Sequence, residues 1–177
     1  NFYLCCMKTV CKGCCLAAIK GGLGQACPFC RTVNPKSDEE SLKMVQKRVD
    51  ARDAVAISHL GDAYFNKAYG LEKDTSRAIE LWSEAAELGS MEALTKMGVA
   101  YHQDSGVAQD KAKGLRYLES AAMQGSAESR HSLGILELVN GNYDRALRHL
   151  EISAKIGYKQ SLDVIKELFA KAPACRQ

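Results

Sequence analysis

Residues 54–65 read AVAISHLGDAYF, and this stretch decides the fold. Ala56, Leu60 and Tyr64 recur every fourth residue, which places them on one stripe of a helix. Gly61 lies beside that stripe and carries no Cβ, so a second helix can approach closely there. The stretch therefore predicts the first helix of a tightly packed helical pair.

Three sets of landmarks recur along the chain in the same order. The first set is Leu60-Gly61-x-x-Tyr64, Met97-Gly98-x-x-Tyr101 and Leu133-Gly134, with the glycines 37 and 36 residues apart. The second set is Ala85-Ala86, Ala121-Ala122 and Ser153-Ala154, followed by Gly89, Gly125 and Gly157. The third set is Gly70-Leu71-x-x-Asp74, Gly106-Val107-x-x-Asp110 and the shorter Gly141-x-x-Asp144. Three series in register indicate an internal repeat.

Each landmark has a physical role in a helical pair. We expect Asp74, Asp110 and Asp144 to cap the start of the second helix with a side-chain oxygen. The glycines after the second set suit the left-handed backbone that ends a helix. The third unit has a shorter interval between its glycine landmarks, so its inter-helix loop should be shorter. Such pairs bury their apolar faces only by stacking on their neighbours.

The combined pattern resembles Sel-1-like repeats, which are relatives of tetratricopeptide repeats. The resemblance covers residues 53–158, in units at about 53–89, 90–125 and 126–158. It implies an all-α fold, an α-solenoid of helix-turn-helix repeats that serves as a protein-interaction scaffold. Residue Glu137 departs from the family by replacing the tyrosine of the third unit.

Both flanks of the array look like caps. Ser37-Asp38-Glu39-Glu40 has the form of a capping box and predicts a helix to about Asp50 inside a linker and cap over residues 34–52. The segment SLDVIKELF from Ser161 resembles the first helix of an unfinished fourth unit, within a capping helix and tail over residues 159–177.

One face of the first helices is expected to bind a protein or peptide ligand. Its positions lie three residues before, one after and four after each repeat glycine, and the selected residues are Ser58, Asp62, Phe65, Thr95, Val99, His102, His131, Ile135 and Leu138. Such a face usually lines the concave groove of a solenoid, where apolar and aromatic groups suit a peptide or helix. The alternative is that some of them pack between units. Nothing predicts a catalytic residue, and the four histidines are interpreted as surface or partly buried groups.

Cysteines divide the chain in two. Seven of the eight lie within the first 30 residues, and Cys175 lies near the end. Local clustering of thiols with two Cys-x-x-Cys pairs favours a zinc site over a disulfide framework, and so an intracellular, cytoplasmic location. One arrangement is a ribbon in which Cys11, Cys14, Cys27 and Cys30 hold a single ion.

The other arrangement follows from a resemblance of residues 5–31 to the C-terminal two-thirds of a RING finger. In that family the ligand pairs interleave, which implies that Cys27 and Cys30 share an ion with Cys6, or with Cys5, while Cys11 and Cys14 serve another. Lys8 stands where a RING has histidine, so Cys5 and Cys6 would act together. We predict a partial finger over residues 1–33.

The RING resemblance implies a ubiquitin ligase whose finger recruits a conjugating enzyme and whose repeats recruit a substrate. Arg31, just after the last ligand, would contact the ubiquitin conjugate. The opening Cys-x-x-Cys is missing and residue 1 is Asn, so we expect a fragment or processed product that is inactive alone. The alternative is a noncatalytic adaptor with a structural zinc site. A thiol enzyme built on Cys11-x-x-Cys14 is disfavoured because no thioredoxin pattern surrounds it.

Composition excludes other classes of partner. Apolar residues make up 46% of the chain and charged residues 25%, with 24 basic and 21 acidic residues interleaved for a net charge of +3. This balance gives no basic face for nucleic acid. No segment has the roughly 18 continuous apolar residues that a membrane helix needs, so a soluble chain is expected.

Overall fold

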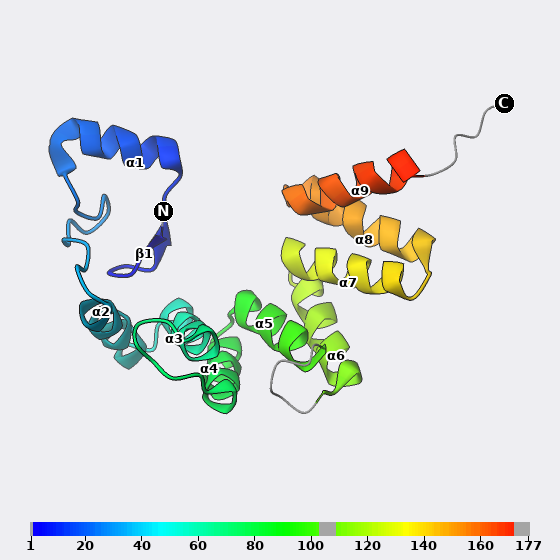
Figure 1. The fold of residues 1–177 in the computed structure, drawn as a ribbon, viewed down its shortest axis with the longest axis horizontal. Coiled ribbons are helices and arrows are strands. Elements are labelled where there is room, and N and C mark those ends of the chain that lie inside the picture. Colours follow the sequence, from blue (N-terminus) through cyan, green and yellow to red (C-terminus); the bar gives the residue numbers. More distant parts are fainter. Residues whose placement is uncertain (1, 103–108, 172–177) are drawn as a thin grey trace. The chain divides into compact units, whose positions relative to one another are not determined.

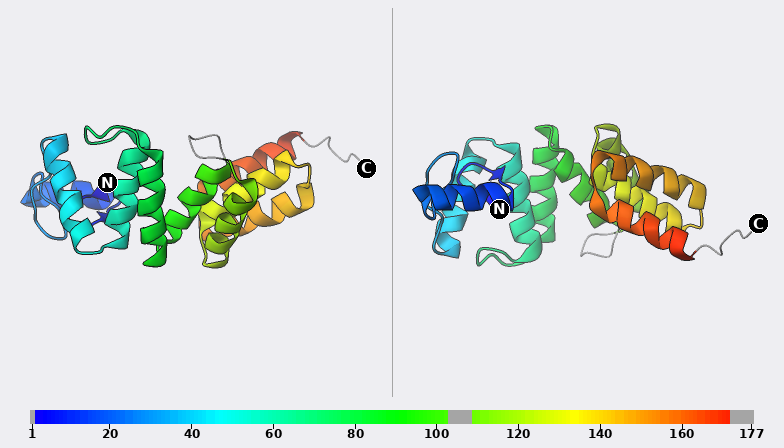
Figure 2. Two further views of the ribbon diagram at one scale, coloured as in Figure 1. Left: turned by 90° about the horizontal axis from the view of Figure 1, so that it is seen from below. Right: turned by 90° about the horizontal axis from the view of Figure 1, so that it is seen from above.

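The computed structural model describes residues 2–102 and 109–171. The chain divides into two units, Asn1–Ser90 and Met91–Gln177. Figures 1 and 2 show that most of the chain is helical, and the predicted all-α solenoid fold is confirmed. None of the helices in the described part of the chain is long and apolar enough to cross a membrane.

The first unit joins the cysteine segment to one helical pair. The elements are β1 (Phe2–Tyr3), β2 (Lys8–Thr9), α1 (Lys12–Ala18), the π-helix η1 (Ile19–Leu23), α2 (Asp38–Asp50), α3 (Ala54–Asn66) and α4 (Thr75–Glu87). Strands β1 and β2 form an antiparallel hairpin in which Tyr3 lies opposite Lys8. Helix α2 packs on α3, and α3 packs along α4 (Figure 1).

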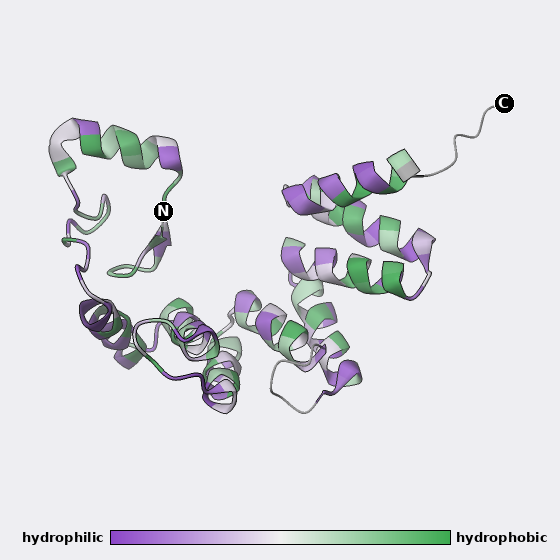
Figure 3. Ribbon diagram, viewed as in Figure 1, coloured by the Kyte–Doolittle hydropathy of each residue, from purple (hydrophilic) through white to green (hydrophobic). Residues whose placement is uncertain are grey.

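The second unit contains two further helical pairs and a final helix. They are α5 (Met91–His102) with α6 (Lys111–Met123), α7 (Ala127–Val139) with α8 (Tyr143–Ile156), and α9 (Lys159–Lys171). Helix α7 also packs on α6, and α9 packs on α8. Figure 3 shows apolar and polar residues alternating along these helices, as expected when each buries one stripe.

The repeat glycines allow the paired helices to touch, as predicted. A Cβ added at Gly61 would lie 2.7 Å from the Trp82 ring, and one at Gly98 would lie 2.6 Å from Leu118. At Gly134 it would lie 2.8 Å from Leu150. Each glycine thus faces a buried side chain of the second helix.

Two of the three predicted caps are confirmed. Asp74 accepts a hydrogen bond from the Arg77 amide, and Asp110 accepts one from the Lys113 amide. The prediction for Asp144 is wrong, because α8 begins after Asn142 and Asp144 already lies in its first turn. The short loop that the sequence predicted, residues 140–142, moves the helix start forward. The Gly106-Val107 landmark and Cys175 lie outside the described residues.

The other helix ends follow the predicted chemistry. Gly89, Gly125 and Gly157 have φ values of 91°, 102° and 106°, in the left-handed region where glycine is favoured. Ser37 caps α2 by accepting from the Glu40 amide, while the Glu40 carboxylate accepts from the Lys36 amide rather than from Ser37 itself.

Helix α9 differs from the first helices of the three pairs at one position. In α3, α5 and α7 the eighth helical residue is Gly61, Gly98 or Gly134. In α9 the eighth residue is Lys166, which is exposed. The helix therefore has the length of a repeat helix without its contact glycine.

Candidate functional site

Four cysteines of the first unit come together in space. Cys5 and Cys6 lie in the turn between β1 and β2, and Cys27 and Cys30 lie in a second turn, closed by hydrogen bonds between Cys27 and residues 31 and 32. All four Sγ atoms lie within 4.8 Å of one another. Those of Cys6 and Cys27 are 3.6 Å apart, and those of Cys5 and Cys30 are 3.3 Å apart.

The electrostatics of this cluster favour a bound cation. Burial raises the pKa of the Cys5 and Cys6 thiols, so their thiolates need a compensating positive charge. Hydrogen bonding with Thr32 lowers the pKa of Cys30 to about 6, which gives one ready thiolate. Since metals bind thiolates and not thiols, four cysteines of this kind are a suitable ligand set for zinc.

Cys11 and Cys14 are not part of the cluster. Both are exposed, and the Cys14 amide donates to the Cys11 Sγ at 3.2 Å, so that Cys11 caps α1. Within residues 2–102 and 109–171, no other potential ligand completes a group of three with them. The ribbon arrangement is therefore wrong in its pairing: Cys27 and Cys30 meet Cys5 and Cys6. The interleaved arrangement places Cys27 and Cys30 with Cys5 and Cys6, as the structure does.

The remaining residues singled out in this segment are not ligands of the cluster. Cys15 is buried, with its Sγ 3.4 Å from the hydroxyl of Tyr3, and both belong to a small apolar core with Val10 and Cys27. Arg31 is exposed directly after Cys30, with a φ of 59°. A guanidinium in that place is open to a partner.

Aromatic rings connect the cysteine segment to the first helical pair. The Phe2 ring lies 5.1 Å from the His59 ring, centroid to centroid, and His59 Nε2 lies 2.7 Å from the Tyr69 hydroxyl. His59 thus sits between β1 and the loop after α3, and it has a structural role.

The predicted partner-binding residues do not all lie on a surface. Ser58 is 1% exposed and Thr95 is 2% exposed. The Thr95 hydroxyl lies 2.7 Å from that of Ser129 on α7, inside the second unit. For these two residues, burial supports the alternative interpretation, that they pack between helices.

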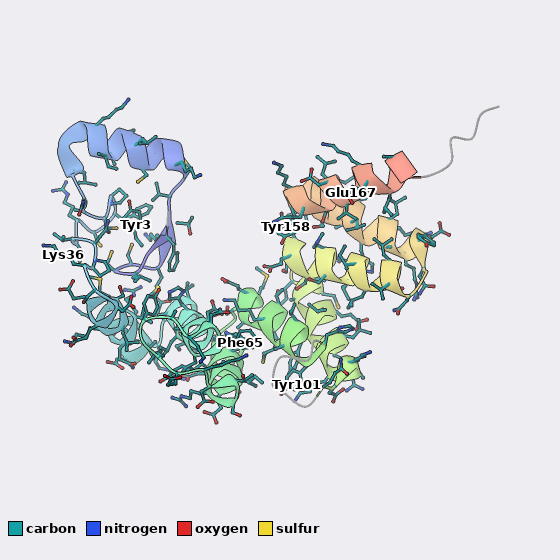
Figure 4. The ribbon with its side chains drawn as sticks, in the orientation of Figure 1. Tyr3, Lys36, Phe65, Tyr101, Tyr158 and Glu167 are labelled. Carbon is teal, nitrogen blue, oxygen red and sulfur yellow. The ribbon has the colours of Figure 1, made fainter. Side chains whose placement is uncertain are left out.

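Two other predicted residues lie around the tryptophan of the first unit. Asp62 accepts a hydrogen bond from Trp82 Nε1 at 3.1 Å, and the Phe65 ring lies 5.3 Å from the Trp82 ring. Both are half-buried, and Figure 4 labels Phe65 on α3. They support the packing of Trp82 while leaving part of their surface open.

Four predicted residues meet in one groove of the second unit. The groove has a volume of about 230 Å³, and its lining is Val99, His102, Leu118, His131, Ser132, Ile135 and Leu136. Predicted Leu138 is half-buried on α7 but does not line it. Leu118, Ser132 and Leu136 were not among the predicted residues, although the apolar position facing each repeat glycine could have indicated Leu118.

The ring of His131 is held in place from the side of α9. Its Nδ1 lies 2.9 Å from the Ser161 hydroxyl, and its ring lies 5.1 Å from that of Tyr158, which Figure 4 labels just before α9. The Ser161 hydroxyl donates to Ser153, and the Ser153 hydroxyl donates to the Ala127 carbonyl oxygen. Both serines are fully buried. Burial lowers the pKa of His131, which keeps the ring neutral near pH 7.

Helical pairs that pack through a contact glycine define an α-solenoid of the tetratricopeptide-like class. The model of the Sel1 repeat matches residues 54–90, 92–126 and 129–158. The chain therefore belongs to the Sel1 repeat family and is a protein-interaction scaffold of that type. The matched residues do not include the cysteine segment.

Similar proteins support the family and the fold. Human protein sel-1 homolog 2 is 30% identical over 137 residues, which is 77% of this chain and 19% of that protein. The chain thus spans about a fifth of its length. A Sel1 repeat protein from Oxalobacter formigenes has a TM-score of 0.65 at 27% identity, over 74% of this chain and 54% of that one. The uropathogenic Escherichia coli antigen c5321, which displays an SLR fold, has a TM-score of 0.66 at 23% identity, over 80% and 30%.

Proposed function

We propose that the chain holds a partner protein in the groove of its second unit, beside a zinc module that belongs to a RING-type ubiquitin ligase. The observation that carries the first part is the groove itself, where Val99, His102, His131 and Ile135 meet. The observation that carries the second part is the group of four cysteines. The full-length protein would be an intracellular, cytoplasmic one in this proposal.

The groove has the chemistry of a protein-binding pocket. Val99, Leu118, Ile135 and Leu136 supply apolar surface, and the two imidazoles and the Ser132 hydroxyl supply polar groups. No charged carboxylate, lysine or arginine is among its lining residues. Pockets of this kind take a partner's large side chain, and few such contacts carry most of the binding energy.

Charge insertion tests the groove as a binding surface. Ile135→Asp should abolish capture of partner proteins by the immobilised full-length protein, because the carboxylate would have to be desolvated on binding. Met123→Asp is the matched control, since Met123 is 84% exposed and does not line the groove. Proteins retained by wild type and by Met123→Asp but lost with Ile135→Asp support the proposal. An unchanged set of captured proteins refutes it.

Zinc is the ion that the four cysteines fit. With Zn–S bonds of about 2.3 Å, a tetrahedral site has its sulfurs about 3.8 Å apart. The separations of 3.3 Å and 3.6 Å, with all four Sγ atoms within 4.8 Å, agree with that geometry. When bound, the ion supplies structural stability, on the order of 10 kcal/mol in small zinc modules.

Metal content distinguishes the ligand pairs. Replacing Cys5 and Cys6 by Ser should release the ion, because it leaves two thiolates in the cluster. Replacing Cys11 and Cys14 by Ser is the matched control and should leave that ion in place. The metal content of each double variant is measured after dialysis. The charge-transfer absorption of the Co²⁺-loaded protein reports whether thiolates still bind the ion. Loss of the ion in the control alone would overturn the assignment.

The ligase part requires activity of the full-length protein. Exposed Arg31 stands where a RING finger contacts the ubiquitin conjugate, so Arg31→Ala should reduce autoubiquitination while zinc stays bound. No autoubiquitination by full-length protein with a panel of conjugating enzymes, despite bound zinc, would refute the ligase part. The second candidate, a noncatalytic adaptor with a structural zinc site, would then stand.

A further inference from the structure

The proton positions around His131 are fixed by a chain of directed hydrogen bonds. The Ser153 hydroxyl proton goes to the Ala127 carbonyl, so Ser153 can only accept from Ser161. The single Ser161 proton is thereby used, and Ser161 can only accept from His131. The neutral imidazole therefore carries its proton on Nδ1, and Nε2 has a lone pair and accepts.

Nε2 is therefore the acceptor that His131 can offer to a ligand. Nδ1 is taken by Ser161 on α9, while His131 also lines the groove between α5, α6 and α7. Among the described residues, Ser161 is the hydrogen-bond partner found for this ring. The groove thus combines apolar side chains with the polar groups of His102, His131 and Ser132. The His131 ring is held by the fully buried Ser161 and by the Tyr158 ring. A preorganised acceptor loses little entropy when a ligand binds.

We propose that this groove takes a tryptophan side chain of the partner protein, with the indole N–H donating to His131 Nε2. The inference rests on the proposed partner-binding function and names its ligand. Indole is a donor only, and Nε2 of this tautomer is an acceptor only, so the pair leaves no polar atom unsatisfied. A lysine or arginine would meet no carboxylate in the lining.

The size of the groove agrees with a single large side chain. Its volume of about 230 Å³ suits one aromatic residue and not a helix or a strand. Val99, Ile135 and Leu136 supply apolar contacts for the ring faces, and large aromatic side chains are enriched among interface anchors.

N-acetyltryptophanamide and its 1-methylindole derivative test the proposal, because methylation removes the donor and keeps the ring. With the full chain followed by NMR, the unmethylated probe should shift the signals of groove residues. The methylated probe should bind about 5- to 10-fold more weakly, as expected for one lost hydrogen bond at a desolvated site. In His131→Phe, the two probes should bind alike.

Tautomer measurement makes the test independent of any folding defect. Long-range ¹H–¹⁵N spectra of wild type should show His131 protonated on Nδ1, and Ser161→Ala should allow both tautomers and reduce the preference for the unmethylated probe. Equal binding of the two probes to wild type, no binding at millimolar concentration, or an Nε2–H tautomer would each overturn the inference. The proposed partner-binding function is tested by a different result: it is refuted if Ile135→Asp captures the same set of proteins as wild type.

Discussion

Substituting Gly61 by alanine tests how the helical pairs are held together. The added Cβ would lie 2.7 Å from two atoms of the Trp82 ring and 3.1 Å from the Ala78 carbonyl oxygen. Trp82 is 3% exposed and cannot move into solvent without breaking its hydrogen bonds to the Ser58 carbonyl and to Asp62.

The magnitude follows from three contributions. Overpacking costs about 1–3 kcal/mol, and a weakened Trp82 hydrogen bond costs about 1 kcal/mol. Alanine returns about 1 kcal/mol of helix propensity. We therefore expect the free energy of unfolding to fall by about 2 kcal/mol, a change of roughly 30-fold in the folding equilibrium.

Fluorescence gives a direct assay, since Trp82 is the single tryptophan of the chain. Urea titration should show a lower midpoint for Gly61→Ala, and the folded protein should emit at longer wavelength because the indole is displaced. Gly21→Ala is the matched control, because a Cβ there meets nothing within 4 Å and the residue has no positive φ. A Gly61→Ala protein as stable as wild type, with unchanged emission, would refute the close-packing argument.

Three further outcomes are expected. Asp74→Ala should lower the free energy of unfolding by about 1 kcal/mol, and Asp144→Ala by less than half as much, because Asp74 caps its helix and Asp144 does not; urea midpoints compare the two. Gly125→Ala should cost about 1 kcal/mol in the same assay, since its φ of 102° is strained for alanine. Burial lowers the pKa values of His131 and His149, so the unfolded chain binds more protons in acid. Stability should be constant above about pH 7 and fall as the pH drops through the usual imidazole pKa of about 6.5; equal urea midpoints at pH 7.5 and 5.5 would contradict this.

The fold was predictable because its signals are local. Apolar spacing, a contact glycine and a terminating glycine lie within each unit of about 36 residues, so the helical pairs follow from short windows of sequence. Asp144 shows the limit of this reasoning. In the first two units the aspartate follows the glycine landmark by four residues, whereas Asp144 follows Gly141 by three. The shorter loop makes Asn142 the residue before α8 and puts Asp144 in the first turn of that helix.

The candidate sites were less predictable because they depend on contacts between segments. Helix geometry alone put Ser58 and Thr95 on the same face as His131, but the way neighbouring helices pack decides which of these positions is covered. Pairing of the cysteines likewise depends on two turns that meet in space. The serine that replaces alanine at position 153 was visible in the repeat pattern, yet its role became clear only beside Ser161.

Lys166 determines how this array could be lengthened by design. A new second helix packed along α9 as closely as in the other pairs would collide with the Lys166 side chain, because each other pair has a glycine at this position. Grafting an additional unit would therefore require Lys166→Gly together with a large apolar residue opposite it. Close pairing of a designed helix with α9 thus depends on the side chain at this one helical position.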